Sequence, residues 1–477
     1  MNYLRHLFTT IGLLTLFFAH AQLPGGTVHE METLHLQQHI LAASAGVYNL
    51  RSNGSVQDVG REAGCTLSPR RLPAGKRLSF YSLSFGWNEA GAETGNTVWE
   101  IRFSADGEKW ASWQPVVPEA HAAGEPLRYN FVSELLFVPP TQQWYQMRMR
   151  SNLLGKGVLP NLLFINCLAP SESVQQPPAR TSQTTNAQPA LRTNCSCAQP
   201  SFISRSGWGC PQPLWNPTPT TPTHLIVHHS AGANTSSNWD GVVLAIWNQH
   251  VNTNGWSDIG YNWLIAPNGQ LYEGRQNSST QDVTGAHFCG FNGRTMGVCM
   301  LGTYTAANIT PEARQTLIHT LAWKACQLNI DLTGTSVHIN SGLLLNHVSG
   351  HRQGCATECP GTTLFADLTA IQFAAKAFQT NGCVVTPVSN LEEVEQLRII
   401  PNPTQGDALL HLRLRGSHEV HYRIFTNAGQ LLHQSAPRQL SGNQTLPLLA
   451  LQDRPAGVYL VQVWVNNRAT LLQVVKE

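Results

Sequence analysis

Residues 350–361 read Gly-His-Arg-Gln-Gly-Cys-Ala-Thr-Glu-Cys-Pro-Gly, and this stretch decides how the rest of the chain is interpreted. It places the imidazole of His351 and the thiol of Cys359 eight positions apart in a segment rich in glycine and proline. Such a loop can turn both side chains onto one small cation, and nitrogen and sulfur ligands favour zinc over Mg²⁺ or Ca²⁺. A catalytic zinc needs three protein ligands and an open position for water, so a third ligand is expected elsewhere.

The run Leu-Ile-Val-His-His-Ser-Ala at residues 225–231 is the best source of that third ligand. Its apolar residues predict a short buried strand that ends in two histidines, His228 and His229. The pattern of this run does not by itself decide which of the two faces the metal.

Length and composition suggest an exported protein of several domains. At ~100–200 residues per domain, 477 residues suggest three domains. Lys+Arg 30 against Asp+Glu 28 gives a net charge of +2, which argues against a nucleic-acid partner. Residues 1–21 combine Arg5, an apolar run and a small-x-small ending, so they predict a secretory signal peptide. No later segment reaches the ~18 apolar residues of a transmembrane helix, so we expect a secreted or surface-attached protein.

The chain has 11 cysteines, an odd number, which in an oxidising compartment leaves one thiol without a partner. If Cys359 is a zinc thiolate, the other ten suffice for five disulfides. A disulfide between Cys359 and Cys355 is the alternative. In the first region we expect Cys65 to pair with Cys167.

Three folded regions and two linkers follow from the patterning. Residues 22–169 alternate at period two and predict an all-β sandwich, whose Trp residues belong to the core or, alternatively, stack on glycans. Residues 170–200 and 384–396 are predicted linkers. Residues 201–383 alternate strands and helices, with Ser237 and Thr310 as expected helix caps, and predict an α/β domain. Residues 397–477 predict a small β-sandwich, with separate strands at 409–414 and 419–425.

Six segments of the middle domain occur in order and together resemble the peptidoglycan recognition protein / type 2 N-acetylmuramoyl-L-alanine amidase family. They are residues 226–231, 254–262, 272–275, 285–287, 296–298 and 350–361. The resemblance implies a mixed sheet flanked by helices, with zinc on the floor of a cleft.

Carried onto this chain, the family's three zinc ligands fall on His228, His351 and Cys359. The catalytic tyrosine falls on Tyr261, whose hydroxyl orients the water or donates to the oxyanion. Thr357 occupies the position that carries Lys in phage enzymes and Thr in animal amidases.

Four further residues are candidates for substrate binding. His229 and Asn292 are expected to line the cleft, and His287 either contacts the substrate or transition state or is a structural hydrogen-bonding group. Arg352 either pairs structurally or binds a peptide carboxylate.

The C-terminal region resembles the sorting domain of the type IX secretion route. The resemblance rests on Pro401-Asn402-Pro403 and on segments 427–430, 455–459 and 474–476. The type IX machinery is therefore an expected partner, with export across the outer membrane after transit of the periplasm. An immunoglobulin-like adhesive module is the alternative.

The expected function is hydrolysis of the amide between the lactyl group of N-acetylmuramic acid and L-alanine in peptidoglycan. One alternative is a protein that binds muropeptides without cutting them. Another is a zinc peptidase that acts on the stem peptide.

Overall fold

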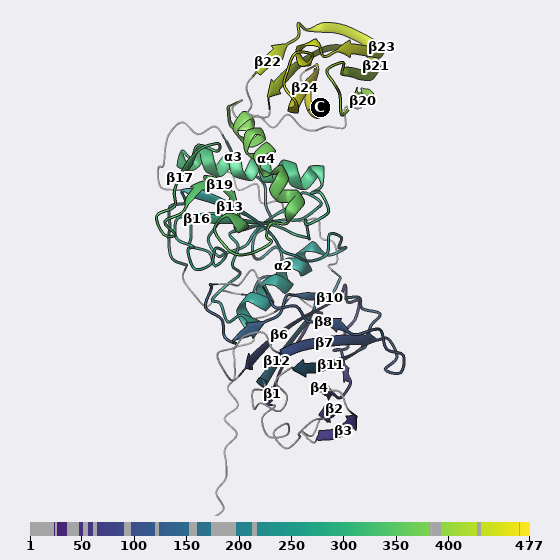
Figure 1. Cartoon of the computed structure of the whole chain (residues 1–477), viewed down its shortest axis with the longest axis vertical. Coiled ribbons are helices and arrows are strands. Elements are labelled where there is room, and N and C mark those ends of the chain that lie inside the picture. The colour runs from purple at the N-terminus through teal and green to yellow at the C-terminus, as the bar shows by residue number, and fades with distance from the viewer. Residues whose placement is uncertain are drawn as a thin grey trace, which may run out of the picture.

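A computed structural model describes residues 23, 26–35, 47–50, 56–60, 64–89, 97–119, 124–151, 160–172, 197–211, 217–380, 383, 393–426, 431–466 and 468–477. The predicted signal peptide, most of both linkers and segment 427–430 lie outside these residues. Figure 1 shows three bodies in chain order, with the α/β body between two β bodies.

The N-terminal body consists of two sheets, as the period-two pattern predicts. The first contains β1 (Val28–His35), β12 (Pro160–Ala169), β6 (Tyr81–Glu89) and β10 (Leu136–Val138) in that order, with β9 (Phe131–Val132) beside β6. The second contains β3 (Val56–Gly60), β2 (Val47–Leu50), β4 (Gly64–Leu67), β11 (Trp144–Ser151), β7 (Thr97–Ser104) and β8 (Gln114–Pro115), with β5 (Arg70–Arg71) beside β11. Phe85 of β6 and Ile101 of β7 belong to one buried cluster, so the two sheets share a core.

The tryptophans of this body divide between core and surface. Trp99 is buried in the shared core, which agrees with the structural interpretation. Trp110 and Trp113 are partly exposed, and the Arg102 guanidinium lies over their rings at 5.0 and 4.4 Å from the centroids. Stacking on arginine explains these two rings without a glycan.

The central sheet has the strand order β15 (Leu271–Glu273), β14 (Trp263–Ile265), β16 (Thr295–Met300), β13 (His224–His229), β19 (Val348–Gly350). β13 runs parallel to β16 and β19, whereas β14 and β15 are antiparallel, so the sheet is mixed, as the family resemblance implies. A small hairpin of β17 (Thr335–Val337) and β18 (Leu344–Asn346) stands beside it.

Helices cover both faces of this sheet. Leu225 and Val227 of β13 pack with α3 (Pro311–Leu328) and α4 (Thr362–Thr380) in one apolar cluster. On the other face, α2 (Trp239–Asn248) packs with β14 and with Phe80 and Leu168 of the N-terminal body. α2 therefore lies between the central sheet and the N-terminal strands (Figure 1).

The helix caps agree with the sequence in one case and differ by one residue in the other. Thr310 caps α3 by accepting a hydrogen bond from the Ala313 amide at 3.2 Å, as predicted. The cap of α2 is Asn238, whose Oδ1 accepts from the Gly241 amide at 2.8 Å, so the expectation of Ser237 was wrong. Ser and Asn cap about equally well, so periodicity cannot distinguish neighbours of these types.

The C-terminal body is one connected sheet in the order β20 (Val394–Ile400), β21 (Leu409–Thr426), β24 (Gly457–Val465), β25 (Arg468–Lys476). β22 (Leu431–Gln434) and β23 (Arg438–Pro447) also pair with β21. The two strands predicted at 409–414 and 419–425 are one strand. β21 is irregular between Leu414 and Ser417, where Gly416 takes a positive φ of 89°, and pairing continues on either side.

None of the helices that the structure describes is long and apolar enough to span a membrane.

A buried polar network joins the N-terminal and central bodies beside α2. Thr253 ends η2 (Gln249–Thr253), and its hydroxyl lies 2.6 Å from Ser84 Oγ of β6. The same hydroxyl accepts from Asn166 Nδ2 of β12 at 3.0 Å. Because these groups are buried, each hydrogen bond has to be satisfied within the interface.

The substitution Thr253→Val keeps the shape of the side chain but leaves the Ser84 hydroxyl and the Asn166 amide short of a partner. We expect a loss of about 1–3 kcal/mol, seen as a lower urea midpoint. Thr305→Val, at an exposed threonine, is the matched control. Equal midpoints for the two variants would contradict the importance of this network.

Candidate metal centre

Parallel strand pairing brings two of the three predicted ligands together. In the register of β13 and β19, Val227 stands opposite Gly350. His228 comes next in β13, and His351 comes directly after β19. The centroids of their rings therefore lie only 4.5 Å apart. His351 opens η3 (His351–Gln353).

Cys359 reaches the same point because the loop after η3 turns back. The Arg352 amide donates to the Cys359 carbonyl at 2.9 Å, which closes the loop. Cys359 Sγ lies 3.7 Å from His228 Nδ1 and accepts from the His229 amide at 3.3 Å. The thiol is buried and free, so the alternative disulfide with Cys355 is absent.

The three side chains fit a tetrahedral zinc. Their candidate ligand atoms all lie within 4.8 Å of one another, and all three residues are buried. Zn–N and Zn–S bonds of ordinary length would separate such a nitrogen and sulfur by about 3.5 Å, close to the 3.7 Å between His228 Nδ1 and Cys359 Sγ. A second group of Cys289, His351 and Cys355 is also close, but its cysteines form a disulfide with each other.

Strand alternation separates the two neighbouring histidines. His229 lies on the opposite face of β13 from His228, and its Nδ1 accepts from the Tyr304 amide at 3.3 Å. His229 is 3% exposed, so it is packed inside the domain. Its predicted role in substrate binding remains a prediction, and these contacts are structural.

His287 lies directly behind His228. With His228 Nδ1 turned to Cys359, His228 Nε2–H donates to His287 Nδ1 at 3.0 Å. His287 Nε2 in turn lies 3.2 Å from the Thr295 hydroxyl. Burial lowers the pKa of His287 to about 3, so its ring is neutral and can accept this hydrogen bond. Of the two roles left open for His287, these contacts fit the structural one.

Asn292 fixes the loop that carries His287. Its Oδ1 accepts from the amides of His287 and Phe288 at 2.7 and 2.9 Å. Its Nδ2 donates to Glu125 of the N-terminal body at 2.5 Å. The amide group of Asn292 is thus engaged in holding backbone.

Tyr261 stands beside His228, with ring centroids 5.2 Å apart. Burial raises the pKa of its hydroxyl well above the ordinary value, and the neighbouring Cys299 and Cys359 raise it further. The hydroxyl is therefore protonated at neutral pH and can act as a hydrogen-bond donor.

Thr357 and Arg352 brace the loop that carries Cys359. Thr357 Oγ1 accepts from the Cys359 amide at 3.2 Å. The Arg352 guanidinium donates to the Glu358 carbonyl and lies 5.1 Å from the ring centroid of Phe365. These contacts are structural, and they leave 22% of the Arg352 side chain exposed.

Disulfides were expected, but the pairs that form were not predicted, and more thiols are free than the cysteine count suggested. Cys289 and Cys355 link the loop behind His228 to the ligand loop, and Cys197 pairs with Cys383. Four described cysteines are free thiols, namely Cys167, Cys210, Cys299 and Cys359. The expected pairing of Cys65 with Cys167 is therefore absent, and Cys359 is not the single unpaired thiol. Parity of the count carries no information on connectivity.

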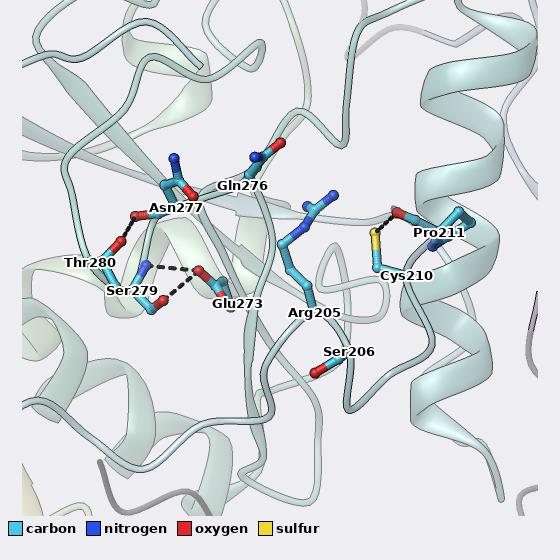
Figure 2. Close-up of a pocket in the computed structure, with 9 residues that line it drawn as sticks. All are labelled: Arg205, Ser206, Cys210, Pro211, Glu273, Gln276, Asn277, Ser279 and Thr280. Atoms are coloured by element: carbon cyan, nitrogen blue, oxygen red, sulfur yellow. Dashed lines mark hydrogen bonds between the residues drawn. The ribbon is translucent and has the colours of Figure 1, made fainter. Parts of the chain in front are cut away.

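A cavity of about 260 Å³ lies away from this centre and includes none of the predicted site residues. It is lined by Arg205, Ser206, Cys210, Pro211, Glu273, Gln276, Asn277, Ser279 and Thr280. Figure 2 shows Ser279 donating to Glu273 through both its amide and its hydroxyl, at 3.0 and 2.6 Å. Thr280 and Cys210 likewise donate to the carbonyls of Asn277 and Pro211 (Figure 2).

Comparison with known proteins relates the central region of the chain to one family. A family model described as N-acetylmuramoyl-L-alanine amidase matches residues 218–362. Peptidoglycan-recognition protein SC1a of Drosophila melanogaster is 32% identical over 169 residues, which are 35% of this chain and 83% of that protein. N-acetylmuramoyl-L-alanine amidase of Homo sapiens is 38% identical over 118 residues, 24% of this chain and 18% of the human protein. The solved structure of wild-type Drosophila PGRP-LB is 26% identical, with 35% of this chain and 92% of that chain covered and a TM-score of 0.30.

The cluster of His228, His351 and Cys359 defines a candidate metal centre in an α/β domain. By sequence, the chain belongs to the family of peptidoglycan-recognition proteins and N-acetylmuramoyl-L-alanine amidases.

The disulfide between Cys289 and Cys355 can be tested by Cys355→Ser. It closes a loop with a sequence separation of 66, for which the chain-entropy model gives up to about 4 kcal/mol. We expect a lower melting temperature and faster loss of bound zinc to a chelator, because the ligand loop is no longer tied to the loop behind His228. Cys210→Ser, at a free thiol, should change neither.

Proposed function

We propose that this protein is a zinc-dependent N-acetylmuramoyl-L-alanine amidase. The observation that carries the proposal is the convergence of His228, His351 and Cys359, which leaves a tetrahedral ion one open position. Zinc held there would lower the pKa of a bound water to ~7 and so supply hydroxide at neutral pH. Membership of the amidase family supports the lactyl–L-alanine amide of peptidoglycan as the bond that is cut.

Three other residues would stabilise the reacting group or hold the zinc ligands in position. Tyr261, protonated and beside His228, would donate a hydrogen bond to the oxygen on which negative charge develops. His287 holds the ring of His228 in the orientation that turns Nδ1 toward Cys359. Thr357 holds the backbone at Cys359 and borders the site, so we keep it as a catalytic candidate.

Four residues were predicted to bind substrate, namely His229, His287, Asn292 and Arg352. A substrate contact requires that the side chain reach the surface. Arg352 meets that condition, since 22% of its side chain is exposed, whereas the other three residues are buried. A guanidinium at this edge suits a stem-peptide carboxylate.

A muropeptide-binding protein without activity is the second candidate, because relatives of this chain bear the name peptidoglycan-recognition protein. The presence of all three ligand side chains and of Tyr261 favours the enzyme. A zinc peptidase acting within the stem peptide would expose a different amine.

We also propose the surrounding organisation. Residues 1–21 would direct export, residues 22–169 would form an accessory domain, and residues 201–383 would form the amidase domain, with linkers at 170–200 and 384–396. Residues 397–477 would act as a type IX sorting domain, which places the protein outside the cell or on its surface. The Pro401-Asn402-Pro403 entry supports the last assignment.

Digestion of purified peptidoglycan by the full mature chain, followed by mass spectrometry, tests the reaction. We expect stem peptides that begin with a free L-alanine. Activity should be abolished by a zinc chelator and by Cys359→Ala, and Tyr261→Phe should lower the rate about 10²–10³-fold.

Cys210→Ala, which removes a free thiol outside the site, is the control. Intact peptidoglycan with retained binding would support the recognition function instead. New amines within the stem peptide would indicate a peptidase.

A further inference from the structure

A short segment of the N-terminal body crosses onto the loops around the candidate metal centre. We call residues 124–128 the bridging segment. On one side, the Arg128 amide donates to the Asn254 carbonyl at 2.8 Å, and Arg128 Nη1 donates to the Asn252 carbonyl at 2.9 Å. The indole of Trp256 donates to the Pro126 carbonyl at 2.9 Å. The bridging segment is therefore fixed to the loop at 252–256.

That first loop supports Tyr261. The ring of Trp256 lies 4.6 Å from that of His250, which lies 5.6 Å from the ring of Tyr261. The Gly260 amide, next to Tyr261, donates to His250 Nδ1 at 3.1 Å. One end of the bridging segment thus contacts Trp256, which packs on His250, the neighbour of Tyr261.

The other end is fixed to the loop behind His228. Glu125 Oε1 accepts from the Gly290 amide at 2.7 Å and from Asn292 Nδ2 at 2.5 Å. Gly124, with φ +81°, approaches so closely that a Cβ there would meet the Cys289 carbonyl oxygen at 2.8 Å. Two donors on one carboxylate oxygen make a charge-assisted contact, stronger than neutral hydrogen bonds of the same length.

From Glu125 a series of hydrogen bonds leads to His228 through the backbone and the ring of His287. Glu125 accepts from Asn292, Asn292 accepts from the His287 amide at 2.7 Å, and His287 accepts from His228 Nε2–H at 3.0 Å. Asn292 and His287 are 6% and 2% exposed, so the two bonds between Asn292, His287 and His228 form away from bulk water. Outer partners of this kind orient a ligating imidazole and tune its affinity for metal.

We propose that the N-terminal body is part of the active site and that Glu125 is a positioning residue for His228. The bridging segment holds both the loop beside Tyr261 and the loop behind His228, and Glu125 acts as the hydrogen-bond acceptor that fixes Asn292. This inference rests on the proposed function for its catalytic meaning. The contacts themselves do not depend on the reaction.

Three variants of the full mature chain test the proposal. Glu125→Ala removes the acceptor, and Glu125→Gln keeps a side-chain oxygen in its place without the charge. Glu108→Ala, at an exposed glutamate of the same body, is the matched control. Glu125 is only half-buried, so these substitutions leave the core of either body intact.

Three measurements are made on each variant. They are hydrogen exchange of the His287 and Phe288 amides, the rate of zinc loss to a chromophoric chelator, and peptidoglycan hydrolysis. In Glu125→Ala we expect faster exchange of both amides, about 10-fold faster zinc loss and a lower kcat. Glu125→Gln should recover most of each value, and Glu108→Ala should match the wild type.

The proposal is overturned if Glu125→Ala matches the wild type in amide exchange and zinc retention, or if Glu125→Gln recovers nothing. A wild-type protein that fails to cut peptidoglycan refutes the proposed function, while exchange of the two amides still decides the role of Glu125. Conversely, normal exchange in an active Glu125→Ala variant refutes the positioning role and leaves the amidase intact.

Discussion

The parallel pairing of β13 with β19 is the constraint on which the candidate centre depends. Opposing Val227 with Gly350 sets His228 beside His351 where the two strands end. A slip of one residue would turn His228 to the opposite face and bring His229 in its place. The register is held by apolar residues on both faces, since Leu225 and Val227 pack on α3 and α4 while Ile226 packs with Phe288. Packing of the core therefore sets the geometry of the ligands.

Around this pair the polar groups form a closed second layer. His287, Asn292 and Thr295 bond to one another or to the backbone, and the disulfide of Cys289 with Cys355 ties their loop to the ligand loop. Such a layer limits the rotation of the His228 ring. A metal centre needs this restriction if its ligands are to be held in place before the ion binds. His287 and Asn292, which the sequence offered as candidates for substrate binding, are both part of this layer.

The N-terminal body is joined to the central domain by both apolar and polar contacts. Its Phe80 and Leu168 join the apolar cluster of α2, and its Ser84 and Asn166 bond to Thr253 at the end of η2. A shared apolar cluster together with satisfied buried hydrogen bonds defines an orientation as well as a contact. This interface fixes the N-terminal body on the central domain. The bridging segment, which belongs to that body, therefore lies within reach of both loops of the site.

The sequence alone predicted the zinc-type ligand set, the alternating strands and helices of the middle region and the cap at Thr310, because these depend on local periodicity, capping chemistry and ordered motifs. His228 was separated from His229 only through family resemblance, and strand alternation then gave the physical reason. The disulfide partner of Cys355, the single strand at 409–426 and the contact of Glu125 with Asn292 had no local signal. Each joins residues far apart in the chain, or continues a strand through a bulge at Gly416, and only the packing of whole elements decides such pairings.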